Sequence, residues 1–288
     1  MKNNSYTRRN FLRNSTAFAA GTIVLPNITR STVFGKTTLS NQIQSDMIGT
    51  GTQILKNLYQ VGGDLNGLTF DLQGALWNDA NSYILKTPEG LVMFDCGCGD
   101  TMEQIFRNMK YWDLSPDNIK YCFLTHPHLD HAGGAHILKN KGVKFIAVKE
   151  TVDAVASGDE RCAGYLYHKK FTPVVVDRIV SDGDMVEILG LKIKIGHYPG
   201  HSMGCTAYSF IYENRRITVS GDIIGTLLAG DFGWDGSFDF DKKIYIESLR
   251  KFAKVEMDIM LPGHGLIYFH KPQWRVEEAL NSALIQWR

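Results

Sequence analysis

From about Ile54 onward, short apolar runs alternate with glycine, proline and aspartate along the chain. Most of these runs are rich in β-branched or aromatic residues, a composition typical of β-strands. The predicted strands cover residues 58–61, 81–85, 91–95, 121–125, 144–148, 184–188, 191–198, 206–211 and 216–220.

Helices are predicted where apolar residues recur at positions i, i+3 and i+4. This spacing predicts helices over Thr101–Met109 and Asp241–Lys254, and a third near Gly133–Lys139. The strand–helix order occurs twice, once before about residue 170 and once after it. Two sheets packed face to face, with helices on their outer sides, would bury so many short strands, so we expect an α+β fold. The long irregular segment Gly225–Asp239 is expected to be functional, since compact domains rarely keep such loops.

The net charge of +1 is the sum of a basic N-terminal segment and an acidic remainder of the chain. Residues 1–36 hold six of the 31 basic residues and no acidic residue, which leaves 25 basic against 30 acidic residues in the rest. A body with this excess of acid attracts nucleic acid poorly, so we expect no nucleic-acid partner. No apolar run reaches 18 residues, and no stable membrane insertion is expected.

The N-terminal sequence Thr7–Arg13, with its Arg8-Arg9 pair, resembles the twin-arginine export signal of bacteria. The apolar stretch Ala17–Pro26 follows it and is too short to span a membrane. We therefore expect residues 1–36 to be a signal peptide read by the twin-arginine export machinery, and residues 37–288 to form a single domain. The expected location is the periplasm or the medium. The five cysteines suit no zinc finger and are expected to be mostly small buried residues.

The strongest chemical signal is the H-x-H-x-D-H motif of His126–His131, directly after an apolar strand. Neutral imidazoles and carboxylates are preferred zinc ligands, and this loop alone offers enough of them for two metal ions. Three further candidates follow other strands and have glycine beside them: His201, Asp222 and His264.

The order of these motifs is similar to that of the metallo-β-lactamase superfamily, over roughly Leu58–Gly265. The resemblance implies an αββα sandwich with two divalent ions at the edge between its sheets, Zn²⁺ first and Mn²⁺ or Fe²⁺ as other choices. It assigns the first ion to His126, His128 and His201, the second to Asp130, His131 and His264, and a bridging position to Asp222. Asp95 matches an acid that supports a ligand through a hydrogen bond, although a turn aspartate is a nearly equal interpretation.

At some positions this sequence differs from the motifs of individual branches of the superfamily, and these differences reduce the number of branches that it can resemble. His128 stands where flavodiiron oxidoreductases place glutamate, and Asp222 stands where one lactamase class has a cysteine ligand. Lactamases whose second site reads D-H-H share the first motif but typically lack the bridging aspartate. Asp222 therefore favours hydrolases that resemble glyoxalase II and lactonases.

The expected activity is hydrolysis, in which a hydroxide between two metal ions attacks a carbonyl group of a lactone, a β-lactam or a thioester. Asp130 is assigned a double role, as metal ligand and as the residue that orients the nucleophile. Substrate contacts are expected, less specifically, from Tyr165, Tyr167, His168 and Trp234. Two alternatives stay open: a mononuclear iron dioxygenase of the persulfide type, and a periplasmic metal-binding protein without turnover. The oligomeric state is not predicted.

Overall fold

Two β-sheets make up the centre of the computed structural model, which describes residues 51–63, 79–225 and 232–287. All of these residues belong to one compact unit, Gln44–Arg288. The expected signal peptide, residues 1–36, lies outside the described residues. Within those residues, no helix combines the length and the apolar character needed to cross a membrane.

The first sheet has seven strands in the order β1-β2-β3-β4-β5-β6-β7. Pairing is antiparallel from β1 to β4 and parallel from β4 to β7. Its strands are β1 (Thr52–Leu55), β2 (Leu58–Gly62), β3 (Ser82–Thr87), β4 (Gly90–Phe94), β5 (Ile119–Phe123), β6 (Lys144–Val148) and β7 (Arg178–Val180).

The second sheet has five strands in the order β12-β11-β10-β9-β8, antiparallel except for the parallel pair β11–β12. Its strands are β8 (Met185–Ile188), β9 (Leu191–His197), β10 (Thr206–Tyr212), β11 (Arg215–Gly221) and β12 (Ile259–Pro262). The helices are α3 (Met102–Tyr111), α4 (Leu129–Ala132), α5 (Ala135–Asn140), α6 (Lys149–Ser157), α7 (Lys242–Phe252) and α8 (Pro272–Gln286), with short 3₁₀ turns η3 (Pro116–Asn118), η4 (Glu160–Cys162) and η5 (Gly164–Tyr167).

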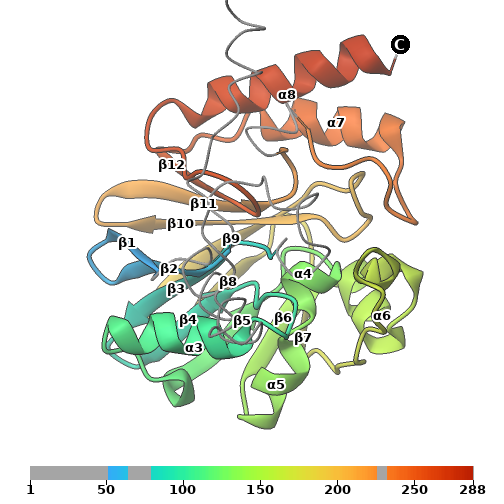
Figure 1. The fold of residues 1–288 in the computed structure, drawn as a ribbon. Coiled ribbons are helices and arrows are strands. Elements are labelled where there is room, and N and C mark those ends of the chain that lie inside the picture. The colour runs from blue at the N-terminus through green and yellow to red at the C-terminus, as the bar shows by residue number, and fades with distance from the viewer. Residues whose placement is uncertain (1–50, 64–78, 226–231, 288) are drawn as a thin grey trace, which may run out of the picture. The chain divides into compact units, whose positions relative to one another are not determined.

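Three hydrophobic clusters hold the layers together. The middle cluster joins the facing sides of the two sheets, for example Phe94 and Phe123 of the first sheet with Tyr208 of the second. A second cluster packs α3, α5 and α6 on the outer side of the seven-stranded sheet. The third packs α7 and α8, which lie side by side in Figure 1, on the outer side of the five-stranded sheet. The predicted αββα sandwich is therefore confirmed.

The predicted helix near Gly133–Lys139 is confirmed as α5, and the structure adds a short helix, α4, directly before it; the two meet at Gly133 and Gly134. A Cβ atom on Gly133 would lie 2.7 Å from the carbonyl oxygen of Cys98, and one on Gly134 would lie 2.2 Å from that of Cys96. These two glycines thus let the loop after β4 pack directly against the helix pair. All five cysteines are buried and free, in agreement with the expectation that they are mostly small buried residues.

Strand directions place several loops at one edge. Strands β9 and β11 run in the same direction because both are antiparallel to β10, and β12 is parallel to β11. The carboxyl ends of β9, β11 and β12 therefore lie at the same edge of the second sheet. The backbone N–H of Thr206 donates to the carbonyl of Thr125 over 2.9 Å, which joins this edge to the end of β5 in the first sheet.

Candidate metal centre

The loop between β5 and α4 is fixed by hydrogen bonds from both sheets. Tyr208 donates its hydroxyl to the carbonyl of Leu124 over 2.6 Å, and the N–H of Thr125 donates to Asp95 Oδ1 over 2.7 Å. The loop then turns into α4, whose four residues include Asp130 and His131. The end of β5 is thus held rigidly at the point where the H-x-H-x-D-H motif begins.

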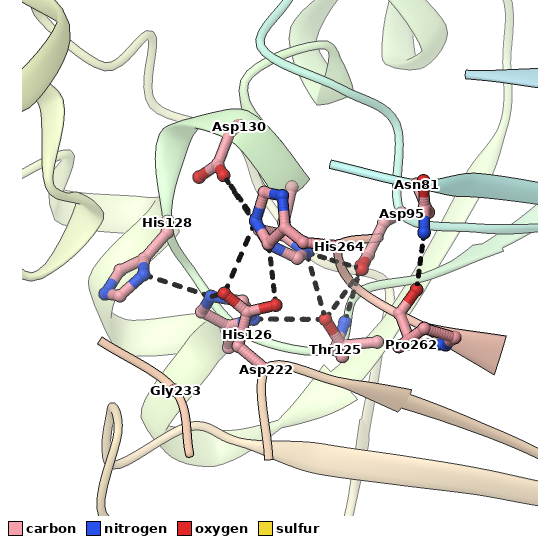
Figure 2. A network of polar contacts seen from close by, with 12 residues as sticks. Asn81, Asp95, Thr125, His126, His128, Asp130, Asp222, Gly233, Pro262 and His264 are labelled. Atoms are coloured by element: carbon pink, nitrogen blue, oxygen red, sulfur yellow. Dashed lines mark hydrogen bonds and ion pairs between the residues drawn. The ribbon is translucent and has the colours of Figure 1, made fainter. Parts of the chain in front are cut away.

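The other three candidate ligands come from the second sheet. Asp222 directly follows β11, His264 follows β12, and His201 lies in the loop between β9 and β10. A Cβ atom on Gly263 would lie 2.1 Å from Asp222 Oδ1, so glycine at this position lets the β12 loop approach that carboxylate closely. Figure 2 shows His126, His264 and Asp222 turned toward one another.

Three imidazoles form the first group. His128 Nδ1 lies 3.0 Å from His126 Nε2 and 3.2 Å from His201 Nε2. The side chains of His126 and His201 are at most 1% exposed. Ligand atoms about 2.0–2.1 Å from a tetrahedral zinc ion would be separated by roughly 3.3 Å, which is close to both distances.

Two imidazoles and a carboxylate form the second group. His264 Nε2 lies 3.1 Å from Asp130 Oδ2 and 3.3 Å from His131 Nε2, and His131 Nε2 lies 3.7 Å from the same carboxylate oxygen. These separations again match those of ligands around one divalent ion.

Asp222 lies between the two groups. Its Oδ2 atom is 3.6 Å from His201 Nε2 of the first group and 3.5 Å from His264 Nε2 of the second. Its Oδ1 atom is 3.4 Å from His131 Nε2 and, among the residues that the structure describes, has no hydrogen-bond partner although it is buried. One carboxylate thus faces both groups, the position that a ligand shared by two ions must occupy.

The donor set also fits metal ions chemically. His126 Nε2 and His201 Nε2 both approach His128 Nδ1, and a single proton on that atom could serve only one of them. Nitrogen lone pairs at this separation repel each other unless a cation lies among them. Divalent ions bound by these residues would satisfy all of the facing atoms at once.

Each of three imidazoles uses its other ring nitrogen for a second contact. His131 Nδ1 lies 2.7 Å from Asp95 Oδ2, and His201 Nδ1 lies 2.7 Å from the carbonyl oxygen of Trp234. His126 Nδ1 lies 3.1 Å from the hydroxyl of Thr125. Such contacts set the ring orientation and leave Nε2 facing the centre.

The pKa values of the histidines in the two groups move in opposite directions. Burial lowers the pKa of His128 to about 3, and burial also lowers the pKa values of His126 and His201. For His264, burial is outweighed by the carboxylates of Asp222 and Asp130, and its pKa rises to about 10. The first group is therefore neutral and ready to bind a cation at pH 7, whereas the second must release protons when it binds one.

The residues predicted to contact substrate lie in different environments. Tyr167 is buried, and burial together with the nearby carboxylate of Asp130 raises the pKa of its hydroxyl well above the ordinary value. Tyr165 is 45% exposed and donates its hydroxyl to the carbonyl of Gly236 over 3.1 Å. His168 is exposed, and Trp234 is 43% exposed while its carbonyl contacts His201.

Sequence reasoning missed several residues that position the ligands. Asn81 donates its side-chain amide to the carbonyl of Pro262 over 3.0 Å, as Figure 2 shows. It also donates to the carbonyl of Gly265 over 3.0 Å, and thereby brackets His264. Tyr245 holds the backbone of Asp222 in a similar way. Their partners are backbone carbonyls, which carry no side-chain signature, and those of Asn81 lie more than 180 residues away in sequence.

Residues 75–264 match the family described as the metallo-beta-lactamase superfamily. A curated relative, the hydroxyacylglutathione hydrolase GloC of Haemophilus influenzae, is 26% identical over 72% of this chain and 91% of its own length. An atrochrysone carboxyl ACP thioesterase of Aspergillus fumigatus and a beta-lactamase-like protein 2 homolog of Caenorhabditis elegans are each 27% identical, over 70% and 68% of this chain. The matches span 55% and 57% of the lengths of these two relatives.

Solved structures share the fold. A metallo-β-lactamase from Cronobacter sakazakii superposes with a TM-score of 0.66 at 20% identity, covering 82% of this chain and 97% of that one. The subclass B3 metallo-β-lactamase BJP-1 of Bradyrhizobium japonicum gives a TM-score of 0.65 at 22% identity, covering 83% and 92%.

Proposed function

The chain belongs to the metallo-β-lactamase superfamily of metal-dependent hydrolases, and we propose that it is an exported enzyme that uses two divalent ions to hydrolyse a carbonyl–heteroatom bond in a small molecule. The observation that carries this proposal is the position of Asp222. Its Oδ2 atom lies 3.5–3.6 Å from an imidazole nitrogen of each ligand group. A site for a single ion would have no need of a carboxylate that faces both groups.

Each candidate ligand has a proposed role in binding metal or in orienting the attacking water. His126, His128 and His201 would hold one ion, and Asp130, His131 and His264 the other, with Asp222 shared. When bound, such ions lower the pKa of water toward neutrality and polarise a carbonyl group. Among the protein's own groups, the carboxylate of Asp130 would help hold the second ion and would orient the water that attacks the carbonyl group. We propose Zn²⁺ as the native ion, with Mn²⁺ and Fe²⁺ as other choices.

Exposed aromatic side chains point to the character of the substrate. Trp234, whose carbonyl contacts His201, is 43% exposed, and Phe238 on the same segment is 68% exposed. Tyr165, 45% exposed, donates its hydroxyl to Gly236 of this segment. We propose that these three rings line an apolar side of the substrate site. The names of two relatives indicate thioester substrates and the solved structures are β-lactamases, so thioesters, lactones and β-lactams are all to be tested.

Export is proposed from the Arg8-Arg9 motif and the apolar stretch behind it, with the twin-arginine machinery as the partner and the periplasm or the medium as the destination. The twin-arginine route carries folded proteins, which suits an enzyme that acquires its metal before it is exported. A small-molecule substrate outside the cytoplasm then follows, with no role for nucleic acid.

Metal content of the purified mature protein, measured by elemental analysis, tests the proposal. About two zinc or manganese ions per chain, together with hydrolysis of a thioester, a lactone or nitrocefin that EDTA abolishes, would support it. One iron per chain would point instead to the dioxygenase, and metal without hydrolysis of any substrate class would point to a binding protein. The convergence of the complete second group, Asp130, His131 and His264, favours the hydrolase.

A further inference from the structure

Four aromatic rings pack together where the end of α8 meets α7. Trp287 lies 4.3 Å from Phe232, 5.4 Å from Phe240 and 5.7 Å from Tyr245 between ring centroids. We refer to these four residues as the C-terminal aromatic cluster. Ring separations in this range are those of favourable aromatic pairs. Tyr245 also contacts Phe232 and Phe240, at centroid distances of 6.5 and 6.2 Å. Trp287 is nearer than Tyr245 to both of these rings, so its removal would take away the nearest ring contact of each.

The cluster is connected to the metal centre through Tyr245. The Tyr245 hydroxyl donates to the carbonyl of Ile223 over 2.9 Å and lies 3.3 Å from that of Asp222. The same hydroxyl accepts a hydrogen bond from the N–H of Gly233 over 2.6 Å. One side chain therefore holds the backbone of the bridging ligand and the backbone next to Trp234.

The segment 232–241 forms a second connection between the cluster and the metal centre. Phe232 and Phe240, near the two ends of this segment, are members of the cluster. Trp234 in this segment gives its carbonyl to His201 Nδ1 over 2.7 Å. Just beyond Phe240, the N–H of Asp241 donates to the carbonyl of Gly200 over 3.0 Å. The segment thus fixes His201 both by its imidazole and by the backbone of the preceding residue.

We propose that Trp287 is a positioning residue for the metal centre, acting through Tyr245 and segment 232–241 on Asp222 and His201. This inference rests on the metal centre of the proposed function. The small residues Ala279 and Ala283 on the buried face of α8 allow the helix to approach its neighbours closely. Trp287 then reaches the segment from the end of the helix, although it is more than 45 residues distant from the segment in sequence.

Trp287→Ala is the direct test, and Trp274→Ala is its matched control. Trp274 belongs to the same helix, but its side chain is 60% exposed and packs against the ammonium group of Lys271. Zinc affinity is measured by competition with a chelator on full-length protein, beside the melting temperature of the metal-free form. We expect the zinc dissociation constant of Trp287→Ala to rise by about tenfold or more, since groups that orient ligands have effects of this size. Trp274→Ala should retain the affinity of the wild type.

Tyr245→Phe provides a second, milder variant, because it removes only the hydroxyl that holds Asp222 and Gly233 and keeps the ring in the cluster. It should weaken zinc binding in the same direction, even if Trp287→Ala does not fold. A lower melting temperature with unchanged zinc affinity in the folded variants would show that the cluster only stabilises the fold and would overturn the inference. Absence of zinc binding by the wild type would instead overturn the proposed function.

Discussion

The Oδ2 atom of Asp95 and the Nδ1 atom of His131 lie 2.7 Å apart in the buried interior. The same carboxylate accepts hydrogen bonds from the N–H and the hydroxyl of Thr125, each over 2.7 Å. Asp95 therefore links the end of β4 to both ends of the ligand loop, and its acceptor atoms fix the ring of His131 with Nε2 facing the metal centre. Of the two interpretations that the sequence left open for Asp95, this geometry favours support of a ligand.

Asp95→Asn should weaken metal binding without unfolding the chain. The backbone of Asp95 has a φ of 53°, a conformation that asparagine tolerates well. One amide oxygen cannot accept from His131 and from both groups of Thr125, so the imidazole loses its orientation. We expect zinc affinity to fall by about 10–100-fold, measured by chelator competition. Asp117→Asn, at an exposed carboxylate that binds Lys141, is the control and should change nothing. Equal affinities in the two variants would contradict the role given to Asp95.

Asp222→Ala should remove metal and activity together. The carboxylate faces both ligand groups, so its loss leaves each ion one ligand short. We expect fewer than two ions per chain by elemental analysis and a fall in the hydrolysis rate of at least about 100-fold. Asp235→Ala changes an exposed aspartate on the neighbouring segment and serves as the control. An unchanged metal stoichiometry in Asp222→Ala would exclude a bridging position.

Arg8→Lys combined with Arg9→Lys should trap the protein in the cytoplasm. The expected signal is read by a receptor through its arginine pair, and lysine keeps the charge but not the planar guanidinium group. Fractionation of cells with an antibody against the domain measures this directly. Replacement of Arg215 by lysine, on the exposed face of β11, controls for the loss of an arginine elsewhere. Normal export of the double variant would refute the twin-arginine assignment.

The sequence predicted the fold wherever a strand is apolar and bounded by glycine or proline, as in β4 and β5. It missed α8, because the large apolar residues Trp274 and Ile285 are exposed whereas the buried face carries Arg275, Ala279 and Ala283. Large apolar residues therefore do not gather on the buried face of this helix, which is the pattern from which a helix is predicted. Only tertiary packing against α7 shows that these small residues are interior.

For the site, the sequence supplied the candidate ligands because each is a histidine or aspartate in a segment that follows an apolar strand. The structure brings them together in groups whose ligand atoms lie within 4.8 Å of one another. The hydrogen-bond partners that orient these ligands could not be predicted in the same way. The partner of His201 is the carbonyl of Trp234, and every residue type offers a carbonyl. For Trp234 the sequence indicated a side-chain role, but the contact with a candidate ligand is made by its backbone.

Asp79, which is not itself a candidate metal ligand, gives a prediction about stability. This carboxylate is 3% exposed and accepts hydrogen bonds from the N–H of Cys98 and the hydroxyl of Thr101. Burial outweighs these bonds and raises the pKa of Asp79 to about 6, from an ordinary value of 3.8. The folded state therefore holds this proton more tightly than the unfolded chain does. As the pH rises from about 4 to 6, the unfolded chain releases the proton first, and the free energy of unfolding decreases.

Asp79→Asn should remove this decrease in the free energy of unfolding, because an amide does not ionise. The hydrogen bond to Thr101 can be kept, since the Thr101 hydroxyl can accept a hydrogen bond from the amide as readily as donate one. At pH 4 the variant and the wild type should be similar in stability. At pH 7 the free energy of unfolding of the variant, relative to that of the wild type, should be higher than at pH 4 by about 3 kcal/mol. This amount corresponds to the two-unit shift in pKa. Urea unfolding of the metal-free proteins at both pH values measures the difference, with Asp117→Asn as an exposed control. Parallel stability profiles for Asp79→Asn and the wild type would show that Asp79 ionises in the folded protein at its ordinary pKa.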